Sequence, residues 1–215
     1  MAHPETTKID KPGRLKTWIG EPPRTSPPEV DGYRLRSHQR FDMLRGSIGG
    51  MALIPFWWVL FSTTVALLGG RYISEFAIMP AQLLIGAFIA LVLVPLLHEA
   101  VHGIAAMLAG VRPSYGIGPG FAYTTFPDPV AKRPYLTIGL APLVVLTTIG
   151  LPLAAVWDAG AGLVLFFLIV NASGAVGDLW MSWRIALQPR DALFVDLADG
   201  FAVLVPDEPP PQPLP

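Results

Sequence analysis

The sequence predicts an all-α membrane protein with about four transmembrane helices and a short cytoplasmic loop or hairpin between the second and third. Of its 215 residues, 52% are hydrophobic and 14% are charged, and the mean hydropathy is +0.50. A soluble domain usually has about 25% charged residues. The charges lie mostly before residue 47 or after residue 183. Long apolar blocks therefore separate polar ends, which is typical of membrane proteins.

Four apolar blocks are long enough to span a bilayer. We expect the first span at about residues 48–70, the second at 81–110, the third at 136–157 and the fourth at 161–187. Each exceeds the roughly 20 apolar residues that a transmembrane helix needs. A soluble helical bundle is the alternative, but its helices would carry polar faces, which these blocks lack.

The positive charges predict an orientation. If the N-terminus is cytoplasmic, only Arg71 among the 15 Lys and Arg residues lies on the outer side. Such a bias matches the preference of membrane proteins for positively charged cytoplasmic loops. Because the number of spans is even, both termini are expected in the cytoplasm.

The ends of the chain are expected to be loosely structured. Residues 1–47 form a basic cytoplasmic region, and residues 1–30 predict a largely disordered tail. Residues 34–45 predict either a basic helix on anionic lipid headgroups or a simple topology anchor. In the C-terminal segment, residues 191–215, we expect a short strand or an amphipathic turn at 193–205, followed by a proline-rich tail.

Composition excludes several functions. The net charge of -1 gives no indication of nucleic-acid binding, and the absence of cysteine excludes disulfides and cysteine-ligated metals. Residues 1–47 contain no early apolar core, so we expect no cleaved signal peptide.

When the spans are trimmed to residues 48–70, 81–110, 136–157 and 161–183, the ionisable side chains within them are His98, Glu99, His102 and Asp178. A charged group near the middle of a bilayer costs about 2.5–3.5 kcal/mol on insertion scales. Such groups are expected to face the protein interior and to have partners. A shared metal ion would give all four a common partner.

The run His98-Glu99-Ala100-Val101-His102 has the H-E-x-x-H spacing. Residues four apart share a helix face, so both imidazoles can reach one ion, while Glu99 can act as a general base on its water. The alternative is that the His and Glu side chains simply hydrogen-bond each other. Zn²⁺ binding supplies about 10 kcal/mol, which offsets the desolvation of these groups.

A catalytic zinc site needs a third protein ligand. Asp178 has a depth in the fourth span similar to that of His98 in the second, so we predict Asp178 as this ligand. The alternative is a charge at a helix end. Asn171 lies nearly two turns before Asp178, where it is expected to bind substrate, orient a ligand or make an interhelical hydrogen bond.

The loop after the second span contains Gly116-Ile117-Gly118-Pro119-Gly120. No Lys-Ser/Thr pair and no βαβ unit accompany it, so a nucleotide site is rejected. Residues 115–126 suit a short hairpin, whose exposed edge would either accept an extended peptide or form an ordinary loop. Pro95, three residues before His98, is expected to allow a kink.

Two motifs together resemble a known family. His98-Glu99-Ala100-Val101-His102-Gly103 and the run from Asn171 to Asp178 resemble small bacterial membrane proteins described as zincin peptidases, over about residues 45–205. The arrangement is also similar to the site-2 protease core. The resemblance implies that His98, His102 and Asp178 bind zinc and that Glu99 activates water. It further implies a multi-pass protein of the bacterial cell membrane.

The sequence therefore predicts a zinc metallopeptidase whose transmembrane domain covers residues 48–190. Its site would open to the cytoplasm and cleave a membrane or membrane-proximal protein. A non-catalytic, metal-binding membrane adaptor is the alternative. A metal transporter is a weaker one, because the ionisable groups form one cluster and no polar pathway crosses the bilayer.

Overall fold

The computed structural model describes residues 17–19, 21–69, 80–118 and 121–207. Most of the predicted disordered tail at 1–30 and the end of the proline-rich tail fall outside these ranges. So does Arg71, on which the predicted orientation partly depends.

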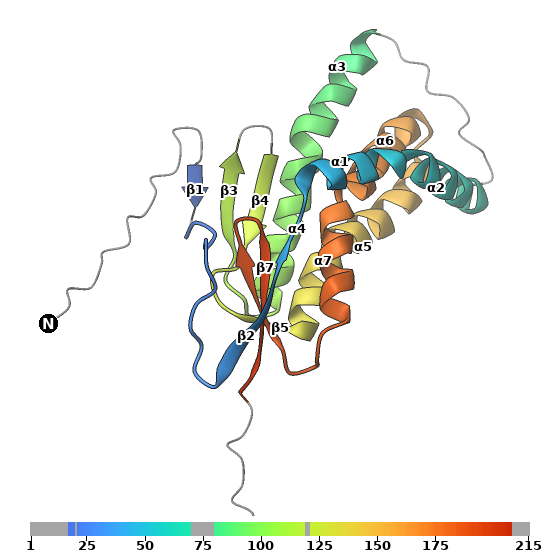
Figure 1. The fold of residues 1–215 in the computed structure, drawn as a ribbon. Helices are drawn as coiled ribbons and strands as arrows, with labels where there is room; N and C mark the ends of the chain where they lie inside the picture. The colour runs from blue at the N-terminus through green and yellow to red at the C-terminus, as the bar shows by residue number, and fades with distance from the viewer. Residues whose placement is uncertain (1–16, 20, 70–79, 119–120, 208–215) are drawn as a thin grey trace, which may run out of the picture.

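Helices make up most of the described chain (Figure 1). Their bounds are α1 Met43–Ala52, α2 Ile54–Gly69, α3 Pro80–Phe88, a π-helical turn Ile89–Leu93, α4 Val94–Leu108, α5 Lys132–Val156, a 3-10 turn Asp158–Gly160, α6 Ala161–Gly174 and α7 Val176–Ala186.

Two of the described helical segments, Leu84–Leu108 and Lys132–Val156, are long and apolar enough to cross a membrane. Two helix pairs pass the same test together but are bent at a short break, α1 with α2 by 43° and α6 with α7 by 45°. The described chain thus has two candidate spans, or up to four if each bent pair counts as one.

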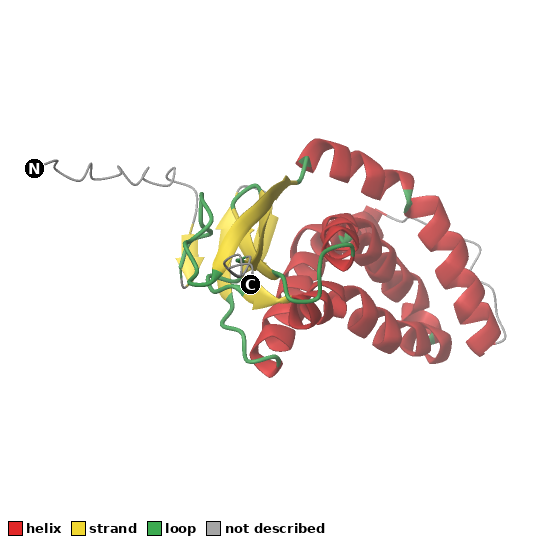
Figure 2. Cartoon of the chain, turned by 60° about the horizontal axis from the view of Figure 1, so that its bottom comes forward, coloured by secondary structure: helices red, strands yellow, loops and turns green. Residues whose placement is uncertain are grey.

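The predicted all-α class is wrong in one respect, because the described residues also form two antiparallel sheets. One has the order β1-β3-β4, and the other has the order β2-β7-β6-β5. Figure 2 shows the strands together on one side of the helices. The strand bounds are β1 Thr17–Ile19, β2 Tyr33–Arg40, β3 Ser114–Gly118, β4 Phe121–Thr125, β5 Val130–Ala131, β6 Leu193–Leu197 and β7 Gly200–Pro206.

Of the two interpretations of residues 34–45, the basic helix is wrong. Residues 33–40 form β2, which pairs with β7 from the far end of the chain. A helix begins only at Met43, where the Asp42 carboxylate accepts a hydrogen bond from the backbone N–H of Arg45. Pairing with β7 supplies the backbone hydrogen bonds that a helix would otherwise form within this segment. The paired residues lie 160 or more positions apart in the chain, so local propensity does not reveal them.

Both hairpins lie where the sequence favours strands. Strands β3 and β4 pair with each other within the segment that connects α4 to α5. At the C-terminal end, β6 and β7 pair in the segment for which a strand or an amphipathic turn was expected. Gly200 begins β7 with φ of +150°, and a Cβ there would lie 2.0 Å from the Gln39 carbonyl oxygen. A residue without a side chain therefore allows β2 to approach this turn.

The four-stranded sheet is covered on both faces. Phe194, Phe201 and Tyr135 pack in a buried aromatic cluster between this sheet and α5. Val195 and Ala202 pack on the opposite face, against Val30 and other residues near the start of the chain. Because side chains alternate across a strand, β6 and β7 contribute to both cores.

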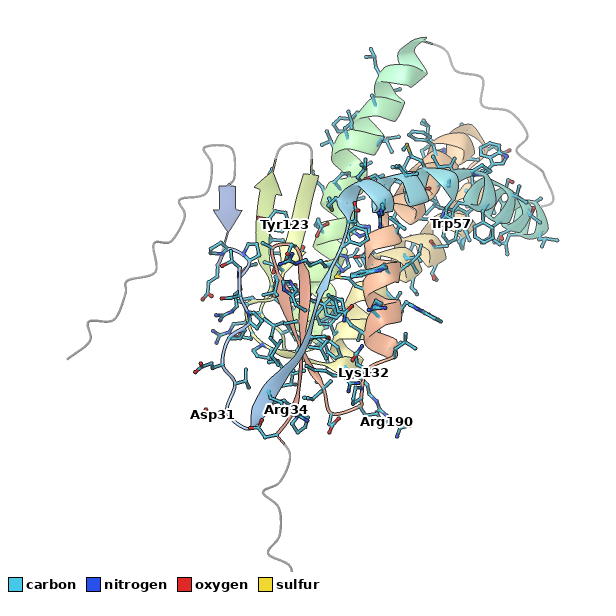
Figure 3. All side chains as sticks on the ribbon, in the orientation of Figure 1. Asp31, Arg34, Trp57, Tyr123, Lys132 and Arg190 are labelled. Carbon is cyan, nitrogen blue, oxygen red and sulfur yellow. The ribbon has the colours of Figure 1, made fainter. Side chains whose placement is uncertain are left out.

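The helical part has its own core and an apolar exterior. Phe61 and Val65 of α2 pack against Leu165 and Leu168 of α6. Large apolar side chains such as Leu67, which is 83% exposed, cover the outside of the helices. In Figure 3, Trp57 lies in this helical part, whereas Arg34, Lys132 and Arg190 lie at the other end of the molecule. Such a division suits a protein that is partly embedded in lipid.

Close packing of α1 on α6 depends on Gly50. A Cβ at Gly50 would lie 2.4 Å from the backbone oxygen of Ser173, near the break between α6 and α7. At the neighbouring Gly49, the nearest atom would be a Val176 methyl at 3.8 Å, an ordinary contact. A side chain is therefore accommodated at Gly49 but not at Gly50.

We expect Gly50→Ala to destabilise the fold by about 1–3 kcal/mol, because α1 must move away from a backbone atom. Gly49→Ala is the matched control and is expected to be neutral or stabilising by about 0.5–1 kcal/mol. Thermal unfolding of both variants in detergent measures the difference. Equal melting temperatures would contradict the assigned packing.

Candidate metal centre

Helix α4 carries both histidines of the H-E-x-x-H run on one face. The His98 and His102 ring centroids are 4.9 Å apart. Pro95 lies in the first turn of α4, directly after the π-helical turn, where its missing N–H removes no regular α-helical bond. At the other end, Gly110 has φ of +74° and the Val111 N–H donates to the Ala106 carbonyl. This glycine cap ends α4 and turns the chain into the hairpin.

Asp178 reaches the two histidines from α7. Its Oδ2 lies 2.9 Å from His98 Nε2, and its Oδ1 lies 3.5 Å from His102 Nε2. One ligand atom from each of the three residues lies within 4.8 Å of the other two. Two ligands bound to one tetrahedral zinc at 2.0–2.1 Å are about 3.4 Å apart, so the three side chains fit such a site. The structure thus brings together the three residues predicted to be ligands.

The hydrogen bond that Nδ1 of each ring makes determines which tautomer the imidazole adopts. His102 Nδ1 donates to the carbonyl oxygen of Ile138 at 2.9 Å, and His98 Nδ1 donates to Oδ1 of Asn171 at the same distance. Both partner oxygens can only accept, so Nδ1 carries the hydrogen in a neutral ring. Each Nε2 lone pair then faces the carboxylate, which is repulsive unless a proton or a metal cation lies between them. Such outer hydrogen bonds are typical of metal-binding histidines.

Asn171 is fully buried, and among the interpretations offered by the sequence the geometry favours that of orienting a ligand. Its Oδ1 accepts from His98, while its Nδ2 has no hydrogen-bond partner among the described residues. A buried amide nitrogen without a partner is costly.

Glu99 lies beside the cluster rather than in it. With His102 and Asp178 it lines a cavity of about 690 Å³. The backbone oxygen of Glu99 accepts a hydrogen bond from Thr124 Oγ1 at 3.1 Å, which joins α4 to β4. Glu99 is therefore next to the three grouped residues and borders a space large enough for part of a peptide.

The walls of this cavity come from distant parts of the chain. Strand β4 lines one side with residues 122–125, and α1 lines another with residues that include Met43 and Met51. The turn between β6 and β7 also contributes, and none of the described residues that line the cavity is Lys or Arg. Figure 1 shows β4, α1 and β7 converging near α4. Of the carboxylates that line the cavity, Asp199 is paired with His38 and Arg40.

Several contributors escaped the sequence analysis. The carbonyl of Ile138 and the hydroxyl of Thr124 act through ordinary groups that no motif marks. Asp196 lies on β6, outside the predicted spans, so the search for charges in lipid passed over it. Burial raises the pKa of the Asp196 carboxyl to about 6, although hydrogen bonds from Tyr135 and Phe126 oppose this rise. Only the tertiary fold brings Asp196 to the cavity.

Comparisons with known proteins agree with the motifs. Residues 91–193 match a protein family described as "Putative zincin peptidase". A protein of Pyrococcus woesei, named "Uncharacterized 24.7 kDa protein in gap 5'region", is 30% identical over 113 residues, or 49% of each chain. The chain thus spans about half the length of this curated relative. No solved structure gives a significant match. The family match covers all five predicted site residues and confirms the resemblance to the zincin peptidases over residues 91–193.

We expect the purified protein to bind one Zn²⁺, and both His98→Ala and Asp178→Ala to lose it, because each change removes a ligand atom. Asn171→Ala should weaken zinc binding by about 10–100-fold by freeing the His98 ring. Metal content after dialysis, followed by competition with a chelator, measures both effects.

His38→Ala is the control for this experiment. His38 pairs with Asp199 on the sheet and is not part of the cluster. Full zinc content in Asp178→Ala, or equal loss in His38→Ala, would contradict the assigned ligand set.

Proposed function

We propose that this chain, which matches the zincin peptidase family over residues 91–193, is a membrane-embedded zinc metallopeptidase. The observation that carries the proposal is the convergence of His98, His102 and Asp178, of which the last two line a cavity together with Glu99. Two imidazoles and one carboxylate form a donor set that suits zinc and leaves a fourth position open.

Zinc bound by these three residues would supply Lewis-acid activation of a water molecule and of the scissile carbonyl. The chain's own residues supply the rest. Glu99 is the general base, which takes a proton from the attacking water and passes it to the leaving amine. Ile138 and Asn171 hold the two rings so that Nε2 of each faces the metal position. Asn171 is not among the described residues that line the cavity, so its proposed role is to orient His98 rather than to contact the substrate.

The substrate is an extended peptide segment. Strand β4 is an edge strand of its sheet among the described strands, and its residues line the cavity beside Glu99. An edge strand offers unpaired backbone groups that can pair with a peptide. Pairing with β4 would lay the peptide backbone along the metal site, while α1 forms the opposite, apolar wall.

The substrate is a membrane protein or a segment close to the bilayer. The site residues lie on helices that could span a membrane. The rest of the cavity is lined partly by residues of the strands, which lie outside these helices. Both termini and the strands are assigned to the cytoplasm, because positive charge gathers on that side. The cavity therefore opens toward the cytoplasmic face.

Glu99→Gln should reduce peptide cleavage by about 10²–10⁴-fold, because the amide cannot accept the proton. Zinc content should be unchanged, because Glu99 is not one of the three grouped residues. Hydrolysis of a fluorogenic peptide library by protein reconstituted in liposomes measures the effect.

The matched control is Glu29→Gln, which changes an exposed glutamate near the start of the chain. Equal activity in Glu99→Gln and the wild type would contradict the role of Glu99. Bound zinc without turnover on any substrate would instead favour the metal-binding adaptor.

The strand-pairing model predicts a pattern in peptide inhibitors. Backbone N-methylation should weaken binding at alternate positions, because only every second N–H of a paired strand points to β4. Inhibition constants for a singly N-methylated series provide the measurement. A flat series, or a loss at every position alike, would exclude pairing with β4.

A further inference from the structure

Asp196 of β6 joins three elements around the cavity. Its Oδ2 accepts a hydrogen bond from the backbone N–H of Phe126 at 3.0 Å, and its Oδ1 accepts one from the Tyr135 hydroxyl. Phe126 follows β4 directly, and Tyr135 lies in the first turn of α5. One carboxylate thus fixes the end of the edge strand and the start of a long helix to the C-terminal hairpin.

Both partners lead to the metal centre within a few residues. Two residues before Phe126, Thr124 donates to the backbone oxygen of Glu99. Three residues after Tyr135, Ile138 accepts from the ring of His102. Asp196 therefore lies at the start of two short paths, one to the predicted base and one to a predicted ligand.

An ionised carboxylate suits this double task better than a neutral group. Each of its oxygens can accept a hydrogen bond, so Phe126 and Tyr135 are held together. A protonated carboxyl or an amide has one good acceptor and one donor, so it accepts from one partner only, and the Tyr135 hydroxyl must then turn from donor to acceptor. Only the charged form accepts a hydrogen bond from both partners at once.

The charge is maintained against its environment. Burial raises the pKa of Asp196 to about 6, with Tyr135 and Thr125 as neighbours and His102 at longer range. Because the folded-state pKa exceeds the usual value of 3.8, ionisation destabilises the fold, fully so above pH 6 and not at all below about pH 4. A residue needed only for packing would avoid this cost as Asn. Costly groups of this kind often serve a function.

We propose that Asp196 is a positioning residue of the active site, which holds β4 and α5 against α4 so that a bound peptide meets Glu99 and the metal. The proposal rests on the proposed peptidase function. It makes the C-terminal hairpin a part of the catalytic unit, although β7 and Asp196 lie beyond the segment that matches the family.

The test compares Asp196→Asn with Asp191→Asn, a change of an exposed aspartate just before β6. Amide hydrogen exchange of residues 121–126, zinc content, melting temperature at pH 8 and the KM and kcat of peptide cleavage are measured for both. In Asp196→Asn we expect about tenfold faster exchange in β4 and about a tenfold higher KM, with zinc content unchanged and melting temperature equal or higher.

A second readout uses the wild type alone. Protection of the β4 amides, corrected for intrinsic exchange, should fall as the pH drops through about 6, and this step should be absent in Asp196→Asn. Tyr135→Phe removes one of the two bonds and should show a smaller increase in exchange.

Two results would overturn the proposal. One is unchanged exchange and KM in Asp196→Asn. The other is a fall in melting temperature together with loss of zinc, which would indicate a general structural role. Hydrogen exchange needs no substrate, so the two hypotheses can fail separately. If the wild type cleaves nothing yet β4 still loosens in Asp196→Asn, the peptidase function fails and the positioning of β4 by Asp196 stands.

Discussion

The contact between Asp178 and the two histidines is the constraint on which the rest of the structure depends. It places a carboxylate opposite two ring nitrogens whose other hydrogen bonds leave their lone pairs pointing inward. Such a group is repulsive without a shared proton or cation, so a metal bound there would be coupled to helix packing. The break between α6 and α7 just before Asp178 and the outer bonds from Ile138 and Asn171 all serve this geometry.

The strands give the metal centre its surroundings. Helices alone would place the ligands but would leave the backbone of a substrate without partners. Strand β4 lies along the cavity, joined to α4 through Thr124 and to the C-terminal hairpin through Asp196. Apolar residues of the hairpin pack against α5 and α7, so the sheet and the helices form one body. Rigid elements therefore support both the proposed base and the proposed peptide edge.

Polar groups are divided between two environments. In the helices that could cross a membrane, the ionisable side chains of the centre lie together, where they can share a proton or a cation, as expected where water is scarce. Asp196 instead lies in the sheet, where burial raises the pKa of its carboxyl without a metal to offset the cost. The first group explains how the centre tolerates an apolar environment. The burial of Asp196 indicates that a loss of stability accompanies the positioning of β4 and α5 around the cavity.

The sequence by itself determined the apolar helices, the H-E-x-x-H face and Asp178 as the partner of His98. These features follow from periodicity, length and the cost of charge in lipid, all of which are local properties. Only the tertiary structure decided that residues 33–40 form a strand, that β4 borders the cavity and that Asp196 joins it. Each of these depends on pairing or hydrogen bonding between residues far apart in the chain, which no local pattern encodes.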